Sequence, residues 1–164
     1  MKAALFAFAC ALPLVAFAAD NPDESFFKKA AEAGMAEVAA GHLAQEKGTS
    51  AAVKDFGAMM VKDHTAANNK LKTIAAAKNV KLPDSPGLMN KAKEKKTDLK
   101  SGESFDKDYI KGQIKAHEET VELLQKEIDS GKDADAQAFA KETLPKVKTH
   151  LDKIKQIAAS AGVQ

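Results

Sequence analysis

Along four long segments of this chain, apolar residues recur at steps of three and four, and no stretch alternates apolar and polar residues in steps of two. This spacing puts the apolar side chains on one face of a helix. The four predicted helices span about 23–47, 50–78, 104–130 and 133–161. Gly48 and Gly131 act as stops in two short connections, and the long middle connection carries a further short helix over about 88–100. The expected fold is therefore all-α, an antiparallel four-helix bundle.

The N-terminus has the pattern of a secretory signal peptide over residues 1–18. Lys2 supplies a positive charge, a largely apolar run follows, and Ala16-Phe17-Ala18 has the form of a cleavage site. The apolar run is too short to span a membrane and polar residues follow it, so no stable membrane insertion is expected after cleavage. We expect an exported, periplasmic protein whose mature part, residues 19–164, forms one bundle domain.

Composition removes several classes of function. The chain's one cysteine, Cys10, lies in the predicted signal peptide, so the mature part has no thiol for a disulfide, a metal site or a nucleophile. All 25 basic residues are lysine, and 23 acidic residues nearly balance them. The chain has no arginine, whose guanidinium group binds bases and phosphates with two hydrogen bonds. Aromatic residues, on which single-stranded bases stack, are only 5% of the chain, so no nucleic acid is expected as a partner. The sequence indicates no protein partner.

One polar residue interrupts the apolar face near the middle of each long helix. These residues are Glu37, His64, His117 and His150. A polar group within an apolar face must find a partner or lose free energy. In an antiparallel bundle the midpoints of the helices lie at one level, so the four groups can converge whichever way each helix runs. Three imidazoles and one carboxylate could hold one divalent transition metal, with Zn, Cu, Fe and Mn as the candidates.

A Glu–His network without metal would satisfy the same four groups, and this alternative stays open. Other polar residues give weaker indications. His42 lies beside the predicted site face. Asp63 points about 100° away from His64, so a surface role or a role supporting a ligand is expected rather than ligation. Asp106 is expected to cap or orient the start of its own helix. Tyr109 is expected to hydrogen-bond into the core, and Gln113 could support the histidine one turn further along.

Several of these segments also carry a resemblance to a known family. They are Ala36-Glu37-Val38-Ala39-Ala40-Gly41, the run from Met60 to His64, the run from Phe105 to Ile110 followed by His117, and Leu144-Pro145 leading to His150. In these segments the chain resembles the ferritin-like family of unknown function 4142, described as predicted outer-membrane or periplasmic proteins. The resemblance implies a ferritin-like bundle and export, with outer-membrane association as a further expectation. It implies no settled activity.

The wider ferritin-like pattern can be tested on this sequence. Diiron bundles place a Glu on each of two helices and Glu-x-x-His on each of the other two. Here the position three before the histidine is Val61 on the second helix and Val147 on the fourth, and the third helix offers His117 in place of a Glu. Only Glu37 remains of the four expected carboxylates, so a diiron centre is not expected.

Three hypotheses follow from the sequence. The first is a periplasmic bundle that binds one transition-metal ion and acts in metal handling or envelope stress. The second is a structural or interaction protein of the cell envelope with a metal-free Glu–His core. The third is a redox enzyme with a mononuclear ion, for which the ligand set is the sole support. No catalytic residue is predicted.

Overall fold

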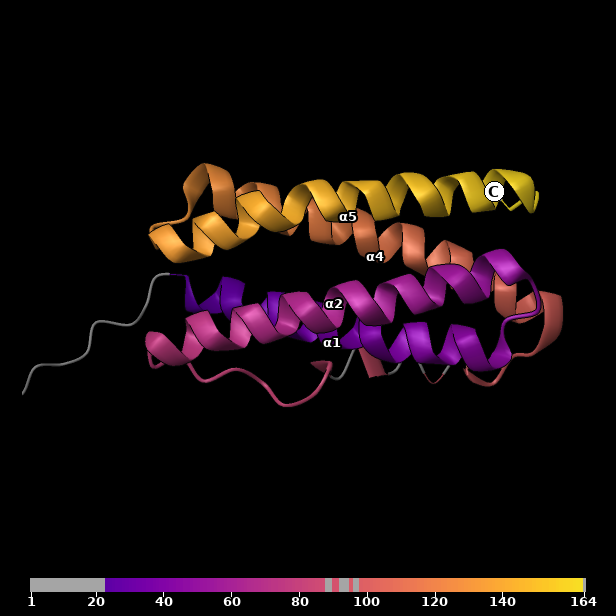
Figure 1. Ribbon diagram of the computed structural model, residues 1–164, viewed down its shortest axis with the longest axis horizontal. Helices are drawn as coiled ribbons and strands as arrows, with labels where there is room; N and C mark the ends of the chain where they lie inside the picture. Colours follow the sequence, from indigo (N-terminus) through magenta and orange to yellow (C-terminus); the bar gives the residue numbers. More distant parts are fainter. Residues whose placement is uncertain (1–22, 88–89, 92–94, 96–97, 164) are drawn as a thin grey trace, which may run out of the picture.

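Figure 1 shows the computed structural model, which describes residues 23–87, 90–91, 95 and 98–163. Within these residues the secondary structure is helical, without a strand. The four long helices are α1 (Glu24–Lys47), α2 (Ala51–Ala77), α4 (Gly102–Ser130) and α5 (Ala134–Ser160). They confirm the predicted all-α four-helix bundle, and each begins and ends within about two residues of its predicted limit.

Two predicted segments fall wholly or partly beyond the described residues. In the predicted short helix over 88–100, Asn90, Lys91, Lys95 and Asp98 are helical, and residues 88–89, 92–94 and 96–97 lie outside the described residues. The predicted signal peptide, residues 1–18, lies outside it as well and stays a prediction. None of the described helices is long and apolar enough to cross a membrane.

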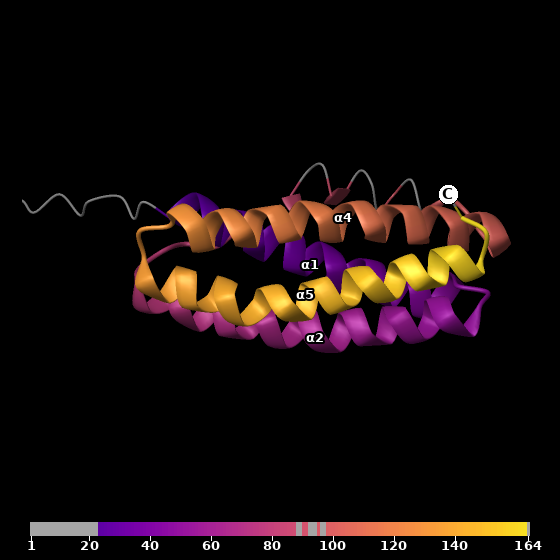
Figure 2. The same cartoon turned by 90° about the horizontal axis from the view of Figure 1, so that it is seen from above.

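The helices form two antiparallel hairpins that lie side by side. α1 and α2 make the first hairpin, α4 and α5 make the second, and the long middle connection joins them (Figure 1). α4 packs against α1, and α5 packs against α2, so each helix has two neighbours (Figures 1 and 2). Contacts are denser within each hairpin than between hairpins. This arrangement brings the midpoints of all four helices to one level.

Two glycines let α1 and α2 approach closely within the first hairpin. A Cβ on Gly41 would lie 2.6 Å from the carbonyl oxygen of Gly57, and a Cβ on Gly57 would lie 2.7 Å from the carbonyl oxygen of Gly41. Each glycine therefore faces the other's backbone, which a side chain could not do without moving a helix. This close contact fixes the position of α2 relative to α1 two turns before His64.

Asp106 of α4 fixes the connection between α1 and α2. Its carboxylate accepts hydrogen bonds from the backbone N–H groups of Thr49 and Ser50, at 3.0 and 2.8 Å, and from the Thr49 hydroxyl at 2.7 Å. Burial alone would raise the pKa of Asp106, but these hydrogen bonds outweigh burial and lower it. The expectation that Asp106 caps or orients its own helix is thus corrected, because its oxygens hold the start of α2 instead.

The buried apolar residues form two clusters, one toward each end of the bundle. The largest fully buried members are Phe27, Leu71 and Leu124 in one cluster, and Phe56, Phe105 and Met60 in the other. On α2, α4 and α5 a single histidine occupies the turns between the two clusters. The polar centre of the bundle is therefore enclosed by apolar side chains along the helix axes.

Candidate metal centre

Three histidines from three helices meet inside the bundle. His64 lies on α2, His117 on α4 and His150 on α5, and they are 7%, 1% and 2% exposed. Their ring centroids are 5.8 Å apart for His64 and His117, 5.5 Å for His64 and His150, and 5.6 Å for His117 and His150. One ligand nitrogen from each histidine lies within 4.8 Å of the other two. The structure thus brings together three of the four residues predicted to converge.

Each of the three rings has one buried nitrogen that accepts or donates no hydrogen bond within the described part of the chain. These atoms are His64 Nε2, His117 Nε2 and His150 Nδ1. A buried polar atom left without a partner costs about 1–3 kcal/mol. Three such atoms in neighbouring rings are therefore a destabilising arrangement in the metal-free protein, and a shared ion would relieve it.

In two of the three rings, the other ring nitrogen donates a hydrogen bond. The proton is therefore on that nitrogen, and the unpartnered nitrogen keeps its lone pair. His117 Nδ1 donates to the backbone carbonyl of Gln113 at 2.9 Å, and His150 Nε2 donates to the carboxylate of Asp63 at 2.9 Å. In a neutral imidazole the nitrogen that does not donate carries the lone pair. His117 Nε2 and His150 Nδ1 are therefore in the form that a metal ion requires, and their rings are held in place.

Burial also keeps two of the rings neutral. It lowers the pKa of His64 from 6.5 to about 3, with further lowering from the neighbouring His117 and His150 when they are charged. Burial lowers the pKa of His150 as well, against the opposing effect of its hydrogen bond to Asp63. Since only the neutral imidazole binds a metal, the apolar surroundings favour the ligand form at neutral pH.

We predict that acid destabilises the metal-free protein through His64. Because its folded pKa of about 3 lies below the ordinary 6.5, the unfolded chain binds more protons between these two pH values. The contribution of neutral His64 to the free energy of unfolding is complete above pH 6.5 and is lost as the pH falls toward 3. The loss reaches about 2 kcal/mol near pH 5. Urea denaturation of chelator-treated protein between pH 7 and pH 5 measures this loss.

The His64→Asn variant is the control for this experiment, because another buried group acts in the opposite direction. Burial, together with the charge and the hydrogen bond of Asp23, raises the pKa of Glu127 to about 7, so its protonation stabilises the protein as the pH falls. The difference between wild type and variant isolates His64. Equal pH dependence in the two proteins would contradict the prediction.

Asp63 supports the site from a neighbouring helix. It adjoins His64 in the sequence, yet its Oδ2 accepts from His150 of α5, and its Oδ1 lies 3.6 Å from the ammonium of Lys146. Burial alone would raise the pKa of Asp63, but the hydrogen bond from His150 and the charge of Lys146 outweigh burial and lower it. An ionised carboxylate behind a ligand histidine orients the ring and strengthens its lone pair.

We predict that Asp63→Asn weakens metal binding by about 10–100-fold, the range typical for the loss of such a supporting carboxylate. An asparagine keeps the size of the side chain but removes the negative charge, so the change tests the carboxylate rather than packing. Competition with a chromophoric chelator measures the affinity. The matched control is Asp152→Asn, a substitution of an exposed aspartate on α5, and wild-type affinity in Asp63→Asn would refute the supporting role.

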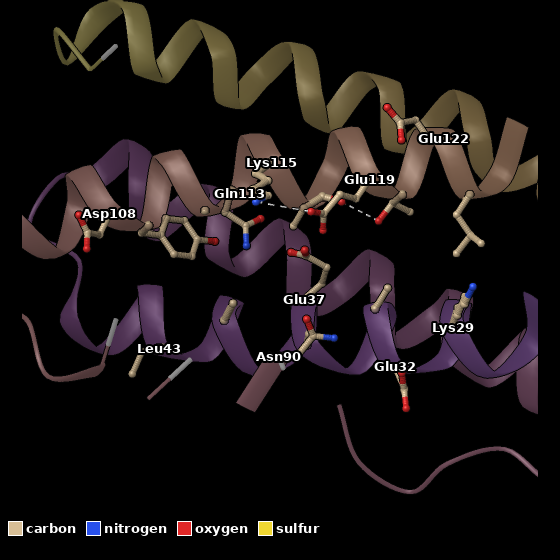
Figure 3. A pocket seen from close by; sticks show the side chains of 18 of the residues that line it. Lys29, Glu32, Glu37, Leu43, Asn90, Asp108, Gln113, Lys115, Glu119 and Glu122 are labelled. Atoms are coloured by element: carbon tan, nitrogen blue, oxygen red, sulfur yellow. Dashed lines mark hydrogen bonds and ion pairs between the residues drawn. The ribbon is translucent and has the colours of Figure 1, made fainter. Parts of the chain in front are cut away.

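Glu37, the fourth predicted ligand, is buried at 4% exposure but does not belong to the group of three histidines. It lines a pocket of about 540 Å³ between α1 and α4, together with Tyr109 and Gln113. Figure 3 shows Glu37 reaching from α1 and Gln113 from α4 toward one another. His42 is exposed, in agreement with its predicted peripheral place. Glu37 as a direct ligand thus stays a prediction.

Comparison with known proteins shows the family of the chain. The pattern of the domain of unknown function DUF4142 matches residues 13–157. The chain belongs to this family. No curated protein matches the sequence, and no solved structure does.

In this DUF4142 protein the positions that would make a diiron centre are filled otherwise. Val61 lies against α1, where its Cγ2 would be 2.9 Å from a Cβ on Gly41, and Val147 is buried in the apolar core. Neither can supply the carboxylate that a bridged pair of irons requires. The described ligand group is the set of three histidines, which suits a single ion.

Proposed function

We propose that this DUF4142 protein is an exported, ferritin-like bundle that binds one transition-metal ion in the periplasm through His64, His117 and His150. The observation that carries the proposal is the cluster of three buried ring nitrogens that lack hydrogen-bond partners among the described residues. Two of the rings are already held by hydrogen bonds on their opposite nitrogens. The ion would serve metal handling or the response to envelope stress, without a catalytic cycle.

The ligand set narrows the identity of the ion. Imidazole nitrogens suit Zn, Cu and Fe, whereas Mn prefers oxygen ligands. A tetrahedrally coordinated ion about 2.0–2.1 Å from each nitrogen requires nitrogens about 3.3 Å apart. The three ligand nitrogens lie within 4.8 Å of one another, so binding would draw the rings together by up to about 1.5 Å. The fourth position would go to a water molecule or to Glu37.

Elemental analysis of the protein purified from the periplasm, without a metal-affinity tag, tests the proposal. About one transition-metal ion per chain is expected, and the ion should be lost from the His64→Ala/His117→Ala double variant. His42→Ala is the matched control, because it removes an exposed histidine from the same chain. Absence of metal from wild type, even after reconstitution with Zn, Cu and Fe salts, would refute the proposal.

A second candidate is a structural protein whose buried histidines stabilise the core without an ion. The hydrogen bonds from His150 to Asp63 and from His117 to the carbonyl of Gln113 favour it, because they give two of the buried rings a partner within the chain. The two candidates differ in their response to a chelator at neutral pH. A chelator should lower the melting temperature of a metal protein and leave that of a metal-free structural protein unchanged.

A further inference from the structure

The pocket between α1 and α4 has a charged rim and a small-residue wall. Its described lining includes five carboxylates, on Glu32, Glu37, Asp108, Glu119 and Glu122, and three lysines, Lys29, Lys115 and Lys126. Alanines of α1 and Gly112 and Ala116 of α4 separate these groups and leave the space between the helices open. An excess of negative charge in a concave site with apolar walls raises the local concentration of cations.

The inner end of this pocket is polar and deeply buried. Tyr109 and Gln113 are 3% and 4% exposed, and neither the Tyr109 hydroxyl nor the Gln113 Oε1 has a hydrogen-bond partner among the described residues. The carboxylate of Glu37 lies in the same part of the pocket, beside Gln113 (Figure 3). Carboxylate, amide and phenol oxygens are ligands that a partly hydrated divalent cation accepts.

This polar end adjoins the histidine cluster through α4. The side chain of Gln113 lines the pocket, and its backbone carbonyl accepts the hydrogen bond from His117 Nδ1 at 2.9 Å. The ring of Phe56 contacts both Tyr109 and His117, with centroids 6.3 and 6.0 Å away. An ion held at the inner end of the pocket would therefore lie about one helical turn from the histidines.

The opposite side of the cluster, between α2 and α5, is less favourable to a cation. There the ammonium of Lys146 lies 3.6 Å from Asp63, whose other oxygen is engaged with His150. Both oxygens of Asp63 are engaged and its charge is balanced by Lys146, so this side attracts a metal ion less than the α1–α4 side with its excess of carboxylates.

We propose that the α1–α4 pocket is a capture site for divalent metal ions, where oxygen atoms of Glu37, Tyr109 and Gln113 receive the ion before it passes to the three histidines. This inference rests on the proposed metal binding and adds the route by which the ion arrives. It gives a role to two buried polar groups that the histidine site alone does not use.

Stopped-flow loading of the metal-free protein with Co²⁺, followed by the visible absorption of the bound ion, tests the route. Gly112→Leu is the main variant, because a Cβ at Gly112 meets nothing within 4 Å, so the leucine fills the pocket without a clash. We expect its loading rate constant to fall at least about tenfold while the equilibrium affinity stays within about threefold of wild type. Gln156→Leu, at an exposed position of α5, is the matched control with an unchanged rate.

A second pair of variants tests the role of charge. Glu122→Lys reverses a carboxylate of the pocket lining, and Glu118→Lys makes the same change on the same helix outside it. Slower loading only in Glu122→Lys, with the difference shrinking at high salt, supports the capture site. Wild-type loading rates in both Gly112→Leu and Glu122→Lys overturn it and leave the histidine site standing. A loss of affinity in Gly112→Leu that matches its loss of loading rate also overturns the capture site. Failure of the wild-type protein to bind Co²⁺ overturns both the capture site and the proposed metal binding.

Discussion

Replacing His117 with alanine is expected to weaken metal binding by at least about 100-fold, or about 2.7 kcal/mol. His117 is the most buried of the three histidines, and its Nδ1 is held by the carbonyl of Gln113, so its other nitrogen is fixed toward the cluster. Without it, two imidazoles remain, and a divalent ion would have to complete its shell with water inside an apolar core. Isothermal titration with Zn²⁺ at neutral pH, against a competing chelator, measures the loss.

Two comparisons separate this effect from general damage to the protein. His42→Ala removes an exposed histidine and should bind as wild type does. His117→Gln keeps a polar side chain of similar size in contact with Phe56, so it should fold as well as wild type and still bind weakly. Wild-type affinity in either His117 variant would show that the ion lies elsewhere.

Gly57→Val is expected to destabilise the fold by about 3 kcal/mol or more, at the upper end for overpacking. A Cβ at this position would lie 2.7 Å from the carbonyl oxygen of Gly41 and 2.8 Å from the Cβ of Ala44, and neither atom can move without moving α1. The first hairpin must therefore open to admit the side chain. Urea denaturation followed by circular dichroism measures the change.

The control for this substitution is Gly112→Val. The same residue change on α4 meets open space, so it carries the helix propensity of valine without the steric clash. A loss of less than about 1 kcal/mol in Gly57→Val would contradict the close approach of the two backbones.

The fold and the level of the site follow from the sequence because both depend on local periodicity. Steps of three and four define each helix, and the short turns impose antiparallel neighbours, so counting from the helix ends places three histidines together. An error of two residues in a helix limit moves a residue by only about 3 Å along the axis, which the cluster tolerates.

The support of His117 by Gln113 could be predicted because it lies within one helix, but two other contacts could not be read in this way, because they cross between helices. A supporting role for Asp63 is one of the two roles that the sequence predicts, but the sequence gives no sign that Asp63 would reach His150 rather than its neighbour His64. Asp106 holds the start of α2 through Thr49 instead of its own helix, which depends on how α4 packs against the α1–α2 turn. The place of Glu37 depends on the rotation of α1, where small residues leave its face weakly defined.

The division of the histidines between the two halves of the molecule has a mechanical consequence. His64 belongs to the first hairpin, whereas His117 and His150 belong to the second, and the contacts between the hairpins are sparser than those within them. A bound ion would act as a reversible cross-link between the two hairpins, because they could not separate without breaking a metal–nitrogen bond. Loss of the ion would remove this link, so the metal-free chain should unfold faster than the metal-bound one.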